Sequence, residues 1–183
     1  ASSPIMATTP SPHFKERLAG IDGFVFDNDG VFTNGTVYLM PGGEQVRTAS
    51  TRDGYAVQHA AKCGMRLAMI TGGRSEEVTR RMNGLGVTEV ISGAAIKLGE
   101  MEALCGRWGL TLDQICYMGD DIPDIPVLEA VGLACCPHDA VPEVRAVCDY
   151  ISPVRGGEGC VRDILEQAMK VKGLWMNDLA HAW

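Results

Sequence analysis

The sequence lacks long hydrophobic runs, basic runs and the cysteine pairs typical of metal sites. No apolar stretch approaches the roughly 20 residues that a membrane-spanning helix needs. Residues 1–20 are rich in Ser, Pro and Thr and carry no apolar segment of signal-peptide length. The net charge is −7, so neither nucleic acid nor an anionic membrane is an expected partner. An anionic substrate would have to be captured by a few local cations.

The cysteines number seven, and none of them belongs to a Cys-x-x-Cys motif. Most lie inside apolar segments, where a thiol packs as a small hydrophobic side chain. This pattern predicts reduced cysteines in a cytoplasmic protein, and it argues against a disulfide framework or a zinc site.

The chain is long and apolar enough to form one domain with a substantial core. It has 183 residues, of which 46% are hydrophobic and 21% are charged, as is usual for a single globular domain. We expect a disordered segment at residues 1–12, one domain at residues 13–173 and a C-terminal tail at residues 174–183.

Apolar runs suited to strands alternate with amphipathic segments suited to helices. Strands are expected to end at Asp27 and to cover 65–70, 87–91, 115–118, 132–136 and 150–151; helices are expected at 55–62, 76–85, 95–108, 124–130, 140–147 and after Gly159. This alternation predicts an α/β fold, a Rossmann-like parallel sheet flanked by helices. Two β-favouring segments around Pro41-Gly42-Gly43 predict an inserted β-hairpin at about 34–49. No insertion is large enough for a cap domain.

The first predicted strand ends in two carboxylates, Asp27 and Asp29, followed by Gly30. If the chain stays extended, both side chains point to the same face. Asp-Asn-Asp-Gly is also ordinary turn chemistry. A calcium loop that starts at Asp27 would need Gly and Glu where Phe32 and Tyr38 stand. Besides the turn, the interpretation that stays open is a nucleophilic carboxylate with a second carboxylate as acid and base.

Other polar residues follow the later apolar strands. Thr71 comes after 65–70, and Asp120, Asp121 and Asp124 come after 115–118, while Lys97 stands near a predicted helix start. Each has an ordinary structural explanation, as a turn residue, a helix cap or a solvated lysine. In a parallel sheet, however, ligands bind beyond the carboxyl ends of the strands, so the residues that directly follow the strands are expected to meet.

Taken together, these motifs resemble those of the haloacid dehalogenase-like phosphohydrolases, over about residues 21–172. The resemblance implies that Asp27 attacks phosphorus and that Asp29 protonates the leaving group and then activates water. It implies that Thr71 and Lys97 bind the phosphoryl oxygens. It also implies a Mg²⁺ ion held by Asp27, the Asp29 carbonyl and Asp120, with Asp121 or Asp124 in support.

Within this family, the predicted hairpin and the lack of a cap domain resemble the 3-deoxy-D-manno-octulosonate 8-phosphate phosphatases of lipopolysaccharide biosynthesis. These phosphatases have no cap domain and are homotetramers. The resemblance implies a sugar phosphate as substrate. Candidate contacts are Thr33, Gly72, Arg52, Arg74 and Arg155; each arginine could equally be a solvated surface residue, and the strand-end position of Arg74 favours it as a contact. Two departures are Asn28, where an apolar residue is usual, and Glu158, where Arg is common. Open alternatives are a phosphatase for a nine-carbon keto-acid 9-phosphate, a non-catalytic oligomerisation module and a mutase.

Overall fold

The computed structural model describes residues 13–183, and the predicted disorder of residues 1–12 lies outside this range. Its centre is a six-stranded sheet in the order β5-β4-β1-β6-β7-β8, in which every neighbouring pair is parallel. The strands are β1 (Gly23–Phe26), β4 (Arg66–Ile70), β5 (Glu89–Ile91), β6 (Ile115–Met118), β7 (Leu133–Cys136) and β8 (Tyr150–Ile151). The predicted parallel α/β sheet is confirmed.

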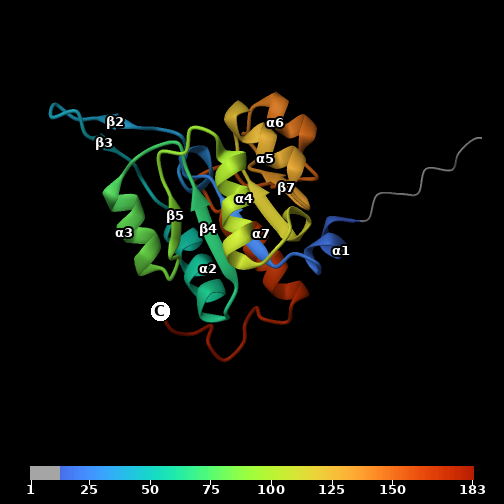
Figure 1. Ribbon diagram of the computed structural model, residues 1–183. Helices are drawn as coiled ribbons and strands as arrows, with labels where there is room; N and C mark the ends of the chain where they lie inside the picture. Colours follow the sequence, from blue (N-terminus) through green and yellow to red (C-terminus); the bar gives the residue numbers. More distant parts are fainter. Residues whose placement is uncertain (1–12) are drawn as a thin grey trace, which may run out of the picture.

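Helices cover both faces of this sheet (Figure 1). They are α1 (Phe14–Leu18), α2 (Thr51–Lys62), α3 (Glu76–Gly84), α4 (Lys97–Trp108), α5 (Ile125–Ala130), α6 (Pro142–Val147) and α7 (Cys160–Val171). One apolar cluster joins the sheet to α1, α2, α3 and α7, and a second joins the opposite face to α4, α5 and α6. Alternate strand residues supply the two clusters: Phe24 and Phe26 belong to the first and Val25 to the second, as the period of a strand requires.

The predicted hairpin is present as a separate antiparallel sheet of β2 (Tyr38–Leu39) and β3 (Gln45–Val46). It projects from the end of the main sheet where the strands finish (Figure 1). Its apolar residues are exposed, since Tyr38 retains 55%, Leu39 79% and Val46 48% of their accessible surface. A two-stranded ribbon of this kind is only marginally stable by itself, so its apolar side chains are available for contact with another chain.

Several predicted boundaries were wrong by a few residues. Helix α2 begins at Thr51 rather than Tyr55, because the Ser50 hydroxyl caps it by accepting a hydrogen bond from the Asp53 amide. Helix α4 begins at Lys97 rather than Ala95, and β5 begins at Glu89 rather than Val87. The long α2 matters for the site, because its first turn carries Arg52 and Asp53 toward the loop before α7.

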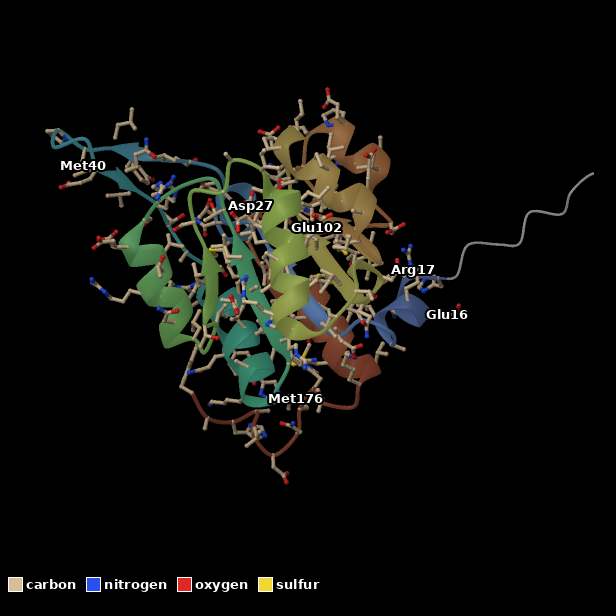
Figure 2. The ribbon with its side chains drawn as sticks, in the orientation of Figure 1. Glu16, Arg17, Asp27, Met40, Glu102 and Met176 are labelled. Atoms are coloured by element: carbon tan, nitrogen blue, oxygen red, sulfur yellow. The ribbon has the colours of Figure 1, made fainter. Side chains whose placement is uncertain are left out.

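The C-terminal tail, residues 174–183, folds back along α2 without forming a helix or strand. The Tyr55 hydroxyl donates a hydrogen bond of 2.6 Å to the Ala180 carbonyl, and Lys62 donates one of 2.7 Å to the Ala182 carbonyl. Trp175 and Trp183 meet the Tyr55 ring edge-on. Figure 2 shows Met176 in this tail at the end of the molecule opposite the hairpin, whose tip carries Met40. Among the described helices, none combines the length and apolar character needed to cross a bilayer.

Candidate active site

A pocket at the carboxyl ends of β1, β4 and β6 collects most of the polar residues that follow these strands. We call it the acidic pocket; its lining includes Asp27, Asp29, Gly30, Thr71, Gly72, Lys97, Asp120, Asp121 and Asp124. Figure 2 places Asp27 at this edge of the sheet. Strands β1 and β6 are neighbours with Phe26 opposite Met118, which is why Asp27 and Asp120 meet although they are far apart in sequence.

Asp27 is held where β1 gives way to a turn over Asn28–Phe32. The Asn28 amide donates a 2.7 Å hydrogen bond to Asp27 Oδ1, while the Asp27 amide donates to the Met118 carbonyl of β6. Gly30 has φ of +80° within this turn, a conformation that favours glycine. The turn therefore fixes the first carboxylate against the sheet and directs the chain back over the pocket.

Lys97 places its ammonium group between two buried carboxylates. Its Nζ lies 3.0 Å from Asp27 Oδ2 and 2.7 Å from Asp124 Oδ1. Burial alone would lower the pKa of Lys97, but Asp27 and Asp124 outweigh it and raise that pKa. The pKa of Asp27 is raised to about 6 by burial and by Asp124, against the opposing effect of Lys97. Lys97 is therefore a fixed cation beside the Asp27 carboxylate.

Asp124 organises its neighbours through four accepted hydrogen bonds. Its Oδ1 accepts from Lys97 and from the Tyr117 hydroxyl at 2.6 Å, and its Oδ2 accepts from the backbone amides of Asp120 and Asp121 at 2.9 and 3.2 Å. Gly119 leaves room for this carboxylate, because a Cβ there would overlap Asp124. Asp124, rather than Asp121, thus holds Lys97 and shapes the loop that presents Asp120.

Asp120 completes an acidic cluster that suits a divalent cation. Carboxylate oxygens of Asp27, Asp120 and Asp124 lie within 4.8 Å of one another. Burial, followed by Asp27 and Asp124, raises the pKa of Asp120 to about 8, which shows how poorly the cluster tolerates its own negative charge. Gly30 makes the approach possible, because a Cβ at that position would overlap the Asp120 carboxylate. Hard oxygen ligands around a small space fit Mg²⁺.

Asp29 stands at the rim of the acidic pocket and is held from the hairpin side. Arg47, just after β3, donates to it from two nitrogens of its guanidinium group: Nε lies 2.6 Å from Oδ1 and Nη2 lies 3.1 Å from Oδ2. The Asp29 side chain remains 37% exposed, whereas the Arg47 side chain is only 9% exposed. The hairpin is thus connected to a pocket carboxylate by a charge-assisted fork.

Thr71 enters the pocket at the end of β4 and is buried. Its hydroxyl oxygen accepts a 3.3 Å hydrogen bond from the Gly73 amide, which leaves the hydroxyl proton for an acceptor in the pocket. The Gly72-Gly73 turn that follows brings backbone close to Asp29 without side chains in between. Thr71 can therefore donate to an anion bound beside Asp27.

The glycine-rich loop before α7 packs against the turn over Asn28–Phe32. The Gly157 amide donates to the Val31 carbonyl at 3.0 Å, and a Cβ at Gly156 would overlap the Gly30 carbonyl. Asp53 accepts from the Arg162 amide at 2.8 Å and so links α2 to the first turn of α7. This loop therefore contributes to the position of Gly30, and through it to the position of Asp120.

Comparison with known proteins shows the family of this chain. A family model described as haloacid dehalogenase-like hydrolase matches residues 48–163, more than half of the chain. The chain belongs to the haloacid dehalogenase-like hydrolases. It is 31% identical to the 3-deoxy-D-manno-octulosonate 8-phosphate phosphatase KdsC of Salmonella typhimurium over 163 residues, covering 89% of this chain and 87% of the relative.

Solved structures of similar proteins have the same fold. The 3-deoxy-D-manno-octulosonate 8-phosphate phosphatase of Yersinia pestis matches with a TM-score of 0.85 at 31% identity, covering 87% of this chain and 86% of that one. The Moraxella catarrhalis phosphatase, determined in complex with a magnesium ion, a phosphate ion and a KDO molecule, matches with a TM-score of 0.83 at 31% identity, covering 86% and 90%. The predicted haloacid dehalogenase-like fold is thereby confirmed.

The predicted residues of this hydrolase divide into two groups. The acidic pocket brings together Asp27, Asp29, Thr71, Gly72, Lys97 and Asp120. Outside it are Thr33, which is buried and accepts hydrogen bonds from the Gly30 and Gly35 amides, and three exposed arginines, Arg52, Arg74 and Arg155. The predicted substrate contacts of these four stay predictions.

The two departures from the family pattern also lie outside the acidic pocket. Asn28 is buried and lines a neighbouring hollow with Arg47, Thr71 and Val78. Glu158 is exposed and lines a surface groove with Arg52 and Arg162. Any effect of Glu158 on substrate would therefore arise in that groove.

Two residues of the site were not predicted from the sequence. Tyr117 is buried among apolar strand residues and bonds Asp124; the signal was a tyrosine at an inward position of a fully apolar strand. Arg47 bonds Asp29, and its signal was a basic residue directly after the second hairpin strand.

Proposed function

We propose that this chain is a Mg²⁺-dependent phosphatase that hydrolyses 3-deoxy-D-manno-octulosonate 8-phosphate to the sugar acid and phosphate. The observation that carries the reaction type is the buried contact of Lys97 with Asp27 beside Asp120. A carboxylate attacks a phosphate dianion only when cations screen it, and positioning and charge stabilisation provide most of the catalysis in phosphoryl transfer. The phosphatase relatives support the substrate.

In the first step, an Asp27 oxygen attacks phosphorus as the bond to the sugar oxygen breaks, which gives an aspartyl-phosphate. Asp29 stands at the rim of the pocket, on the open side, and gives its proton to the departing sugar oxygen. Lys97 and the Thr71 hydroxyl bind the phosphoryl oxygens. Mg²⁺, held by Asp27, Asp120 and the Asp29 carbonyl, supplies further neutralising charge when it is bound.

In the second step, Asp29 removes a proton from water, and the resulting hydroxide attacks the phosphorus of the aspartyl-phosphate. The bond between phosphorus and Asp27 breaks, and inorganic phosphate leaves. The exposed rim at Asp29 gives water access to this position, which favours hydrolysis over transfer to a second sugar hydroxyl, as a mutase would require.

A nine-carbon keto-acid 9-phosphate is the main alternative substrate. It uses the same reacting groups, and Glu158 is the residue at which this chain departs from the Arg that is common in the eight-carbon phosphatases. A carboxylate in the groove with Arg52 and Arg162 changes the charge offered to a substrate that extends that far. The identity and coverage of the relatives nevertheless favour the eight-carbon acid.

The proposed enzyme is a cytoplasmic homotetramer assembled through its hairpins. The exposed Tyr38, Leu39, Met40 and Val46 side chains support a contact between copies of this chain. The seven cysteines are all free, which supports a reducing compartment. Light scattering should give the mass of four chains, and Leu39→Glu should lower it; a monomeric parent protein would contradict the assembly.

The test of the proposed function is phosphate release from a panel of sugar phosphates, measured with Mg²⁺ and again with EDTA. The panel includes the eight-carbon and nine-carbon keto-acid phosphates. We expect EDTA-sensitive release with the highest kcat/KM for the eight-carbon compound. A preference for the nine-carbon compound would contradict the proposed substrate. No phosphate release from any compound would contradict the proposed phosphatase activity and favour a non-catalytic oligomerisation module.

A further inference from the structure

The contact between Arg47 and Asp29 connects the hairpin to the acid and base of the reaction. The two hydrogen bonds, 2.6 Å to Oδ1 and 3.1 Å to Oδ2, occupy both oxygens of the carboxylate. Guanidinium groups form such forks with carboxylates because their donors have a matching fixed geometry, which a lysine cannot reproduce. The direction of the Asp29 side chain is therefore determined by Arg47.

Neighbouring residues hold Arg47 in the position that forms this fork. The Arg47 side chain is 9% exposed although it comes from an exposed hairpin. Gln45 accepts from the same guanidinium group, through its side chain at 3.3 Å and its carbonyl at 3.4 Å. On the other side lies Gly73, where an added Cβ would stand 3.4 Å from Arg47 Nη2 and 3.6 Å from Asp29 Oδ2. Arg47 is thus fixed by both the hairpin and the turn after Thr71.

We propose that Arg47 is a positioning residue for Asp29, which orients its carboxylate toward the leaving oxygen of the substrate and releases one of its oxygens when the substrate binds. This inference rests on the proposed function. Because both oxygens accept hydrogen bonds in the fork, one of them must be released before Asp29 can hold the proton, taken from water in the preceding turnover, that it gives to the sugar oxygen. The remaining bond then keeps the carboxylate aligned. The position of the hairpin thereby controls the acid and base.

The leaving group of the substrate separates this role from a structural one. An alkyl phosphate requires protonation of its departing oxygen, whereas 4-nitrophenyl phosphate releases a stable anion without it. General acid catalysis contributes about 10²–10⁴-fold, so misplacing Asp29 should selectively slow alkyl substrates. We therefore compare three substrates with wild type and Arg47→Gln: the preferred keto-acid phosphate, a hexose 6-phosphate that lacks a carboxylate, and 4-nitrophenyl phosphate.

We expect Arg47→Gln to lower kcat for both alkyl phosphates at least about tenfold more than kcat for 4-nitrophenyl phosphate, as a partial loss of general acid catalysis requires. Equal losses on all three substrates would show that Arg47 only maintains the hairpin and would overturn the proposal. A loss confined to KM for the keto-acid phosphate would assign Arg47 to the substrate carboxylate and would also overturn it.

Two further variants complete the design. Glu44→Gln removes an exposed charge from the same hairpin and should leave all three rates near wild type. Arg47→Lys keeps the charge but cannot form the fork, so it should show the same selective loss of kcat for alkyl phosphates as Arg47→Gln. Wild-type kcat for the alkyl phosphates in Arg47→Lys would show that the fork is not required. If the wild type releases no phosphate from any substrate, the proposed function fails, whereas normal wild-type turnover without the selective loss refutes this inference alone.

Discussion

Lys97 Nζ lies 3.0 Å from Asp27 Oδ2, with both side chains almost fully buried. The same ammonium group lies 2.7 Å from Asp124, so one cation serves the nucleophile and the residue that shapes the Asp120 loop. Each carboxylate would be costly to bury alone, because an ionised group without a partner loses its hydration. Lys97 is therefore needed for the arrangement of the site as well as for binding phosphate.

Replacing Lys97 by Met should reduce both stability and activity. Removing one partner of a buried ion pair costs about 3–5 kcal/mol, and loss of one fixed donor to the reacting phosphate costs about 10²–10³-fold in kcat. Denaturant unfolding in EDTA and phosphate release with Mg²⁺ measure the two effects. The matched control is Lys170→Met, since Lys170 is 60% exposed beside Glu166. A Lys97→Met enzyme with normal kcat would remove Lys97 from the mechanism.

Gly30→Ala should weaken Mg²⁺ binding and activity far more than Gly35→Ala. Both glycines have nearly the same φ, +80° and +81°, so the backbone penalty of alanine is similar. A Cβ at Gly30 overlaps the Asp120 carboxylate, whereas one at Gly35 meets nothing within 4 Å. Calorimetric titration with Mg²⁺ and kcat would compare them. Equal effects of the two substitutions would show that the space beside Asp120 does not matter.

Stabilisation by Mg²⁺ should increase with pH. In the folded protein, burial first and then neighbouring carboxylates raise the pKa of Asp120 from 3.8 to about 8 and that of Asp27 to about 6. Without metal, the folded state therefore binds more protons than the unfolded state between these values, and its stability falls as pH rises from about 4 to about 8. Mg²⁺ removes this loss because it takes the place of the protons.

Melting curves with Mg²⁺ and with EDTA test this expectation. The difference in Tm between the two conditions should be larger at about pH 8 than at about pH 5.5, in line with the direction of the pKa shifts. Asp120→Asn should remove most of the difference at the higher pH. A Tm difference that stays constant with pH would show that the cluster does not bind the ion.

The sequence predicts much of this site because its residues follow strands. Apolar runs mark β1, β4 and β6, and in a parallel sheet their carboxyl ends meet; Asp27, Thr71 and Asp120 could therefore be placed together from the sequence. Asp124 also follows β6, whereas Lys97 needed the family resemblance, since a lysine at a helix start is otherwise ordinary.

Arg47 and the start of α2 could not be predicted in the same way. The direction in which a hairpin leans is set by contacts across the chain, here the fork with Asp29 and the space at Gly73. Helix α2 contains Gly54 in its first turn, which weakens the local helix signal. In the structure that glycine lies against Arg81, where a Cβ would stand 2.7 Å from Nη2, so tertiary packing outweighs propensity.

Deletion of residues 174–183 should lower Tm and leave the chemical step intact. The tail contributes the hydrogen bonds of Tyr55 and Lys62 to the Ala180 and Ala182 carbonyls and covers the Tyr55 ring with Trp175 and Trp183. Burial of a large aromatic side chain is worth about 1.5–3 kcal/mol, which predicts a fall in Tm of several degrees. The rate of 4-nitrophenyl phosphate turnover should be unchanged; a large fall in kcat at temperatures well below Tm would connect the tail to the site.

The most direct test of the account is to trap phosphate on Asp27. Asp29→Ala removes the base for the second step, and 4-nitrophenyl phosphate reacts in the first step without protonation, so the aspartyl-phosphate should accumulate. Acid quench after mixing with Mg²⁺, followed by borohydride reduction and peptide mass spectrometry, locates the modified residue. The account predicts homoserine at position 27 in nearly every chain and none in an Asp27→Asn, Asp29→Ala double variant. Release of nitrophenol without any modification, or modification at another residue, would contradict it.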